Sequence, residues 1–196
     1  MKDFLSSIII LHKKKLYQNA LQEINLYEKN NKPNPYILNF KGLTLWLLDD
    51  FKSSIVAYNN GLNLIDREKI NNKPLSVSLI NNRGLAYLKL SKNDEALSDF
   101  NTALKIDPNF VEALNNIGTT YKNLGNNKDA LKFFIYANNK NSSFIPARDN
   151  LINSLTFVDS KTIDNPICKA NLDIQKINTL IFEENNKILE SKILSV

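Results

Sequence analysis

Few residues in this chain could carry out covalent or metal chemistry, and they lie far apart in the sequence. The 196 residues include one histidine, His12, and one cysteine, Cys168. A metal site needs several His, Cys or carboxylate ligands at a characteristic spacing, and a Cys–His nucleophile needs both side chains together. The sequence contains neither arrangement. It also has no glycine-rich loop between a strand and a helix that could hold a phosphate.

Acidic pairs are the remaining candidates for catalysis. Asp49-Asp50 and Glu183-Glu184 supply two carboxylates each. Adjacent residues of a helix point about 100° apart, however, and such pairs usually face solvent. We therefore expect no enzyme activity, no bound metal and no cofactor.

The polar side chains with a regular spacing are asparagines. Asn82, Asn116 and Asn150 follow one another at intervals of 34 residues. Because a carboxamide offers both a donor and an acceptor, a row of them can bind the N–H and C=O groups of an extended peptide. Asparagine is abundant throughout this chain, as in Asn71-Asn72, so part of the regularity could arise by chance.

The same interval organises the stretch from Val77 to Phe144. The residues that coincide at this offset are small or aromatic: Gly84 and Gly118, Tyr87 and Tyr121, Ala96 and Ala130, Phe100 and Phe134, and Ala103 and Ala137. Glycine inside a helix costs about 1 kcal/mol relative to alanine. We therefore expect each glycine to let a first helix lie close against a second helix, with the aromatic residues filling the remaining volume. Pro108 should end the second helix of the first copy, because proline cannot continue the helical hydrogen bonds.

This pattern resembles the tetratricopeptide repeat (TPR), a helix–turn–helix unit of this period. The resemblance implies an all-α fold: a right-handed α-solenoid of about four helix pairs, a capping helix and a C-terminal amphipathic helix. The units that it predicts are 1–34, 35–76, 77–110 and 111–144, with the capping helix at 145–158.

The two N-terminal units match the repeat less closely than the two that follow. Residues 35–76 carry Gly42 at the expected place but contain eight additional residues near Asp66 to Leu75, which predicts a longer loop or an extended helix end. Residues 1–34 have Ile8 in place of the glycine. A degenerate first unit of this kind is expected for a terminal cap.

In a TPR array the first helices of successive units line a concave face. The resemblance therefore implies a peptide-binding role for the asparagines at the fifth and sixth positions of the units: Asn39, Asn81 and Asn115 at the fifth, and Asn82, Asn116 and Asn150 at the sixth. Such rows occur in the TPR arrays of protein O-linked N-acetylglucosamine transferases. Asparagine at the sixth position is also common in the family for packing between units, so both roles stay open. Trp46 is either an aromatic anchor for a ligand or part of the core.

One TPR subfamily can be tested residue by residue. Co-chaperone TPR domains hold a terminal carboxylate with lysine, asparagine and arginine at set places on three first helices. No lysine is found at the corresponding positions of the two best units: Ser78, Asn81, Glu112 and Asn115. Asn116 stands where the arginine is expected. We therefore do not expect recognition of a chaperone tail.

The charge pattern does not favour a nucleic-acid partner. The formal net charge is +5 and the isoelectric point is about 9.1, but the lysines are scattered. The one dense run, His12 to Lys15, falls at a predicted turn. Aromatic residues fall mainly at repeat core positions, so they do not form a base-stacking surface.

Two further features predict a cytoplasmic protein. A single cysteine suits a reducing compartment. The apolar run Phe4 to Leu11 is too short to span a bilayer and has no small-residue cleavage site after it, so we expect neither a membrane anchor nor a signal peptide.

The residues after the repeats form the second predicted part, 159–196. An apolar stripe at helical spacing runs through Ile167, Ala170, Ile174, Ile177 and Ile181. It could fold back on the array as a last cap, dock on a partner, self-associate through 166–194, or lead into a catalytic domain.

The function predicted from these features is a non-catalytic protein–protein interaction module that binds an extended peptide or partner segment on the concave face. The alternative is the substrate-presenting adaptor part of a larger transferase or oxygenase. A third hypothesis is a structural assembly protein that oligomerises through its tail.

Overall fold

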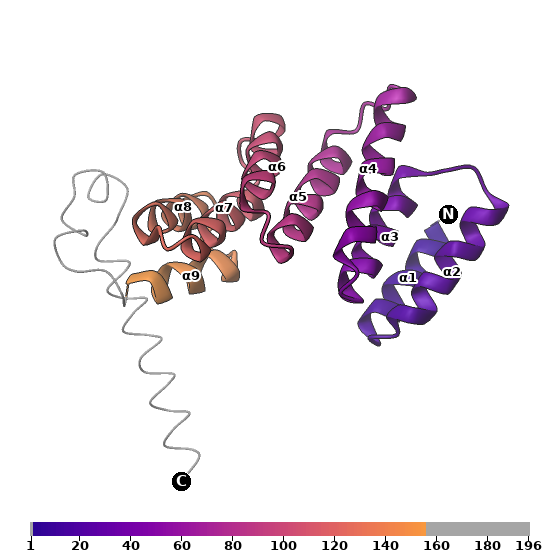
Figure 1. Ribbon diagram of the computed structural model, residues 1–196, viewed down its shortest axis with the longest axis horizontal. Helices are drawn as coiled ribbons and strands as arrows, with labels where there is room; N and C mark the ends of the chain where they lie inside the picture. The colour runs from indigo at the N-terminus through magenta and orange to yellow at the C-terminus, as the bar shows by residue number, and fades with distance from the viewer. Residues whose placement is uncertain (1, 156–196) are drawn as a thin grey trace, which may run out of the picture. The chain divides into compact units, whose positions relative to one another are not determined.

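The computed structural model describes residues 2–155, and all the regular structure in that range is α-helical. Four consecutive helix pairs are followed by a single helix (Figure 1). The bounds are α1 Lys2–Lys13, α2 Tyr17–Asn30, α3 Pro35–Leu47, α4 Phe51–Arg67, α5 Lys73–Lys89, α6 Asn93–Ile106, α7 Val111–Asn123, α8 Asn127–Lys140 and α9 Ile145–Leu155. The predicted C-terminal helix at 166–194, and Cys168, lie outside the described residues.

Polar caps and prolines set several helix ends. The Asn34 side chain accepts hydrogen bonds from the backbone N–H groups of Tyr36 and Ile37, and Pro35 occupies the first turn of α3. This is a favourable N-terminus, because the cap satisfies donors that the helix cannot and proline lacks one of them. At the other end, α6 stops at Ile106, two residues before Pro108, as the sequence predicts.

Three of the repeat glycines lie directly against an aromatic side chain from the second helix of their pair. A Cβ atom on Gly84 would lie 2.6 Å from the Phe100 ring, and one on Gly118 would lie 2.6 Å from the Phe134 ring. Both phenylalanines are fully buried. The same relation recurs in three successive pairs: Gly42 with Tyr58, Gly84 with Phe100, and Gly118 with Phe134. The predicted packing of each glycine against the second helix of its pair is therefore confirmed at these three positions.

The first pair, α1 and α2, fills the space between its helices with different residues. Ile8 stands at the glycine position and Ile24 at the aromatic position, and both are fully buried. They form one core cluster with Ala20 and with Ile37 of α3. A larger residue on the first helix is thus matched by a smaller one on the second, so the volume between the helices stays filled.

The eight additional residues of the second predicted repeat, 35–76, lengthen both helices that flank the loop. Helix α4 has 17 residues, against 14 in each of α2, α6 and α8. Helix α5 also has 17, against 13 in α3 and α7. Most of the insertion is therefore helical, and the loop itself is only one residue longer than the corresponding loops.

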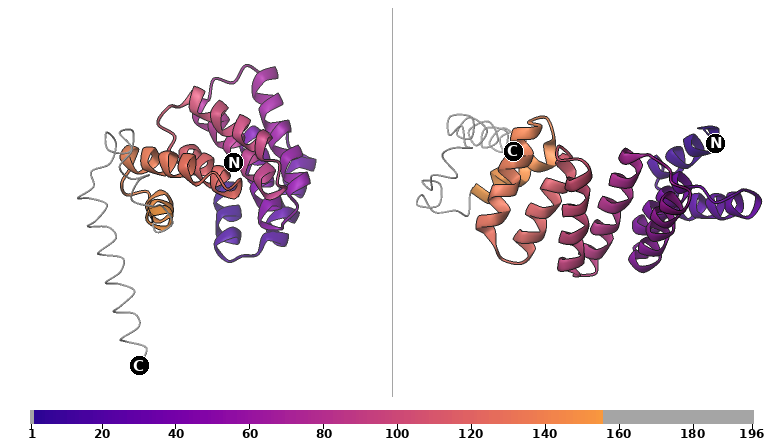
Figure 2. Two further views of the ribbon diagram at one scale, coloured as in Figure 1. Left: turned by 60° about the vertical axis from the view of Figure 1, so that its left-hand side comes forward. Right: turned by 90° about the horizontal axis from the view of Figure 1, so that it is seen from above.

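The chain divides into two compact units, one ending at Ala113 and the other beginning at Leu114. In the first unit, α3 packs on α4, α4 on α5 and α5 on α6, and Figure 2 shows these helices from two further directions. In the second unit, α9 packs on α8. Within residues 2–155, every helix is too short or too polar to cross a lipid bilayer.

Candidate functional site

The six asparagines singled out from the sequence all lie on first helices of the pairs or on the final helix. In the first unit these are Asn39 on α3 and Asn81 and Asn82 on α5. In the second unit they are Asn115 and Asn116 on α7 and Asn150 on α9.

A hydrogen-bonded amide network joins α3 and α5. The Asn82 Nδ2 donates to Asn39 Oδ1 at 3.1 Å, and Asn39 Nδ2 donates to Ser78 Oγ at 3.2 Å. Asn39, Ser78 and Asn82 are half-buried. Because each amide is held by the neighbouring helix, its orientation is fixed.

The second unit repeats this arrangement in the same register. The Asn150 Nδ2 donates to Asn115 Oδ1 at 2.9 Å, which joins α9 to α7. Asn115 is buried, with 7% of its surface exposed, and Asn150 is half-buried. In each compact unit, the asparagine at the sixth position of the later repeat (Asn82 or Asn150) donates to the asparagine at the fifth position of the preceding repeat (Asn39 or Asn115).

The other two asparagines differ in exposure. Asn81 is buried, with 5% of its surface exposed, and Asn116 is half-buried. Both take part in interactions within the protein. Four of the six amides are therefore half-buried: Asn39, Asn82, Asn116 and Asn150.

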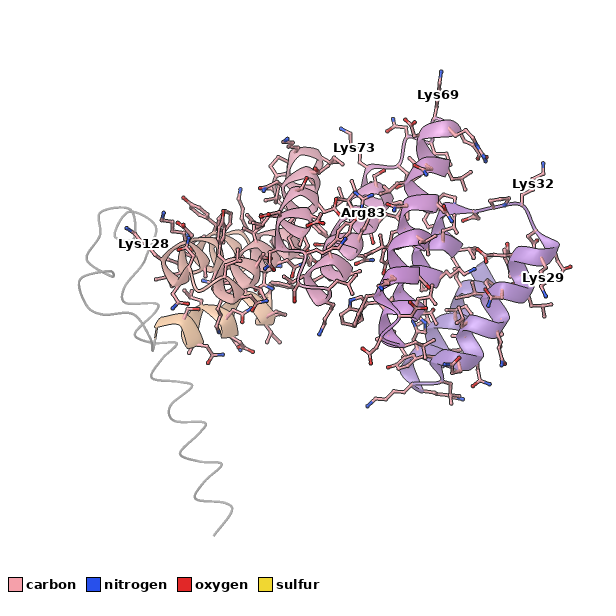
Figure 3. The ribbon with its side chains drawn as sticks, viewed as in Figure 1. Lys29, Lys32, Lys69, Lys73, Arg83 and Lys128 are labelled. Atoms are coloured by element: carbon pink, nitrogen blue, oxygen red, sulfur yellow. The ribbon has the colours of Figure 1, made fainter. Side chains whose placement is uncertain are left out.

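A partly buried ion pair that the sequence did not predict lies beside the amide network. Arg83 on α5 makes a bidentate contact with Asp99 on α6, with Nε–Oδ2 at 2.8 Å and Nη2–Oδ1 at 2.6 Å. Figure 3 labels Arg83 among the side chains of the first unit. Its Nη1 also donates to Asn59 Oδ1 on α4 at 2.6 Å. The hydrogen bonds to Asp99 raise the pKa of Arg83, with burial opposing them. The sequence does contain a signal for this ion pair. Arg83 directly precedes Gly84 and Asp99 directly precedes Phe100, so both charges lie beside the predicted glycine–aromatic contact.

His12 on α1 forms a hydrogen bond with Thr44 on α3. The Thr44 hydroxyl donates to the Phe40 carbonyl at 2.7 Å, so its oxygen accepts from His12 Nε2 at 2.8 Å. Thr44 is fully buried. Partial burial of the imidazole lowers the pKa of His12 below 6.5, because desolvation disfavours the charged ring.

Trp46 belongs to the edge of a core cluster. It packs edge-on against Phe51, with ring centroids 6.1 Å apart, and Lys89 Nζ lies 5.5 Å from the indole centroid. The side chain is half-buried, and its Nε1 atom has no hydrogen-bond partner in the described part of the chain. The half-buried ring leaves both predicted roles of Trp46 open.

The described residues also contain no obvious metal site. Between residues 2 and 155, no three side chains of His, Cys, Asp or Glu type are grouped so that they could hold a metal ion.

Comparisons with known proteins identify the repeat and the fold. A family model described as a TPR repeat matches residues 81–125, which confirms the resemblance over the stretch that contains Gly84 and Gly118. A comparison with curated protein sequences finds no match.

Solved structures with the same fold cover most of the chain at low sequence identity. A MamA RS-1 ArsTM double mutant is 16% identical, covers 95% of this chain and 94% of its own, and superposes with a TM-score of 0.67. MamA 41-end from Desulfovibrio magneticus RS-1 is 16% identical, with coverages of 91% and 93% and a TM-score of 0.64. The APC/C hetero-tetramer Cut9–Hcn1 is 22% identical with a TM-score of 0.70; the match covers 78% of this chain and 29% of that one. These similarities define an all-α TPR-type fold.

Proposed function

We propose that this chain is a non-catalytic protein–protein interaction module that binds an extended peptide or partner segment on the concave face formed by the first helices of its pairs. The TPR match at residues 81–125 and the TPR-type fold support an interaction module in general terms. The half-buried carboxamides support a backbone-binding role for that face.

One observation carries the proposal. Asn82 and Asn150 each donate to the amide of an earlier helix and are held in a fixed orientation while remaining half-buried. A carboxamide has two N–H groups and an oxygen with two lone pairs, so one hydrogen bond to a neighbouring helix leaves further capacity. Each additional bond to a peptide backbone would contribute about 0.5–1.5 kcal/mol.

The test is a selection of random peptides displayed on phage against the full chain. Peptides selected on the natural protein should bind at least about ten-fold more weakly to the triple variant Asn82→Ala, Asn116→Ala, Asn150→Ala. A matched triple variant, Asn19→Ala, Asn101→Ala, Asn127→Ala, removes three exposed amides from second helices and should bind as the natural protein does.

Thermal unfolding of each variant separates binding from packing. If the first triple variant loses its helical circular dichroism, the amides are structural and the proposed binding role is wrong. If it stays folded and binds the selected peptides with unchanged affinity, the ligand does not contact these side chains.

A further inference from the structure

The first unit contains a groove that is separate from the amide face. Helices α2 and α4 both pack on α3, and between them lie two hollows of about 350 and 500 Å³. Both hollows are lined by Glu28 of α2, Leu38 of α3 and Asn60 of α4, so they form one continuous groove. Each hollow is within the size range of sites that bind small ligands or a few side chains.

The groove has an apolar floor. Leu38 and Leu45 of α3 and Leu64 of α4 line its base. Val56 of α4 lines the larger hollow and keeps 57% of its surface exposed. Burying this apolar surface would favour a ligand that brings aliphatic side chains. The lining residues include no aromatic ring, which disfavours a single-stranded nucleic acid.

The α2–α3 and α4–α5 ends of the first unit carry an excess of positive charge. Arg67 lines the smaller hollow, and Figure 3 shows Lys29, Lys32, Lys69 and Lys73 projecting from these helix ends and loops. None of these four lysines forms an ion pair with the described residues. Of the nearby acidic groups, Glu28 is bound by Lys41, Glu68 lies 3.3 Å from Arg67, and Asp66 is exposed in the last turn of α4. These three carboxylates are outnumbered by the five cations Lys29, Lys32, Arg67, Lys69 and Lys73.

Helix electrostatics explain only some of these cations. Lys29 and Arg67 lie in the last turns of α2 and α4, where positive charge complements the helix dipole. Lys73 is the first residue of α5, where the dipole disfavours a cation. The helix dipole therefore does not account for the charge of Lys73.

We propose that the groove between α2 and α4 docks an acidic amphipathic segment of a partner protein. Aliphatic side chains of the segment lie over Leu38, Leu64 and Val56. Its carboxylates face Arg67, Lys29 and Lys32. This site is independent of the amide face and can be tested separately from it.

The probe is a synthetic helix-forming peptide of about 16 residues with leucine along one face and glutamate on both flanks. A control peptide carries glutamine in place of glutamate. Fluorescence anisotropy at roughly 0.15 M ionic strength measures both dissociation constants on the full chain. The glutamate peptide should bind at least about ten-fold more tightly. Equal affinities would overturn the proposal.

Variants then locate the site. Val56→Asp adds a negative charge at an exposed position in the groove, and Lys29→Glu with Arg67→Glu reverses two cations at its end. Each should weaken binding of the glutamate peptide at least about ten-fold. The matched pair Lys122→Glu with Lys128→Glu makes the same change in net charge at exposed residues of α7 and α8, and should change the affinity less than about two-fold.

Two outcomes would contradict the proposal. Equal weakening by the matched pair would mean that the peptide responds to net charge alone. A dimer in sedimentation velocity that Val56→Asp dissociates would mean that a second copy of this chain occupies the groove instead.

Discussion

At three glycines, the absence of a methyl group determines how close two helices can lie. Gly42, Gly84 and Gly118 each face the ring of an aromatic residue sixteen positions later in the chain. The aromatic ring occupies the space that a Cβ would need. This contact explains why a residue that disfavours helix formation recurs in the middle of three helices.

Replacing Gly84 by alanine should lower the free energy of unfolding by about 1–3 kcal/mol, because the new methyl group would overlap the Phe100 ring. Alanine is the better helix former by about 1 kcal/mol, so propensity alone predicts the opposite sign. Urea unfolding followed by circular dichroism measures the change. Adding Phe100→Leu should cost less in the Gly84→Ala background than in the natural protein, since the two residues are in contact.

His12 makes the stability depend on pH. Burial lowers the pKa of His12 below 6.5 in the folded state. Between that lowered value and pH 6.5, the unfolded chain therefore binds a proton that the folded chain does not. The free energy of unfolding should therefore fall as the pH is lowered through this window. His12 contributes no pH dependence above it, where both states are neutral.

His12→Gln keeps a donor for Thr44 but does not titrate. Urea unfolding at pH 7.5 and pH 5 should show a smaller loss of stability for this variant than for the natural protein. An identical loss in both proteins would mean that other groups are responsible.

At the scale of elements, the turns inside the helix pairs share a left-handed residue. The backbone angle φ is 58° at Lys15, 60° at Asp49, 59° at Ser91 and 76° at Gly125. Only the last is a glycine. The left-handed conformation costs other residues roughly 1–2 kcal/mol, so three of the four turns are locally strained.

Ser91→Gly should raise the free energy of unfolding by about 0.5–1 kcal/mol, because the relief of strain exceeds the added flexibility of the unfolded chain. Gly125→Ala should lower it by about 1 kcal/mol, and only through the backbone, since no atom lies within 4 Å of the new methyl group. The control is Ser98→Gly on the exposed side of α6, which should destabilise the protein. Thermal unfolding shows whether each of the three substitutions raises or lowers the stability. A destabilised Ser91→Gly protein would contradict the proposed backbone strain.

The contact of Arg83 with Asp99 and Asn59 links three helices of the first unit. Asp99 is buried and Arg83 is half-buried, so Asp99→Ala leaves a largely desolvated charge without its counter-charge and should cost about 3 kcal/mol, the lower end of the range for buried pairs. The exposed pair of Arg67 and Glu68 provides the comparison, since Glu68→Ala should cost no more than about 1 kcal/mol. Chemical denaturation measures both, and similar costs for the two variants would show that burial does not govern the difference.

At the scale of the whole molecule, a chain built from consecutive helix pairs should not lose its structure uniformly. Stability in such proteins depends on each pair and its immediate neighbours. Phe134 is fully buried, and Phe134→Ala should cost about 3–5 kcal/mol locally. Hydrogen exchange should show a larger loss of protection in α8 and α9 than in α1 to α4. A uniform loss along the chain would indicate a single cooperative unit instead.

The parts of the fold that the sequence could predict are those fixed by local residue types. Gly84 and Gly118 recur with their aromatic partners at one offset, so the helix pairs and their closest contacts follow from the spacing. Pro35 and Pro108 mark helix ends for equally local reasons. The extent of α4 and α5 does not follow from the sequence, because the inserted residues suit both a loop and a helix.

The polar contacts could not be predicted to the same degree, because they depend on side chains from different helices. Asn39 and Asn82 are 43 residues apart in sequence, and only the packing of α5 on α3 brings their amides together. His12 and Thr44 are 32 residues apart. The spacing placed the asparagines on the right helices, but it did not show that they bind one another.

The direction of the amide bonds has a consequence for how the sequence can change over time. Asn39 accepts with its oxygen, whereas Asn82 donates with its nitrogen. Deamidation or mutation of Asn39 to aspartate keeps the accepting oxygen, and Ser78 can reverse its hydroxyl to donate. Aspartate at position 82 would instead place a carboxylate oxygen against the Asn39 oxygen, so that two acceptors face each other. Related chains should therefore tolerate aspartate at the fifth position of a repeat more readily than at the sixth, wherever the fifth side chain is only partly buried.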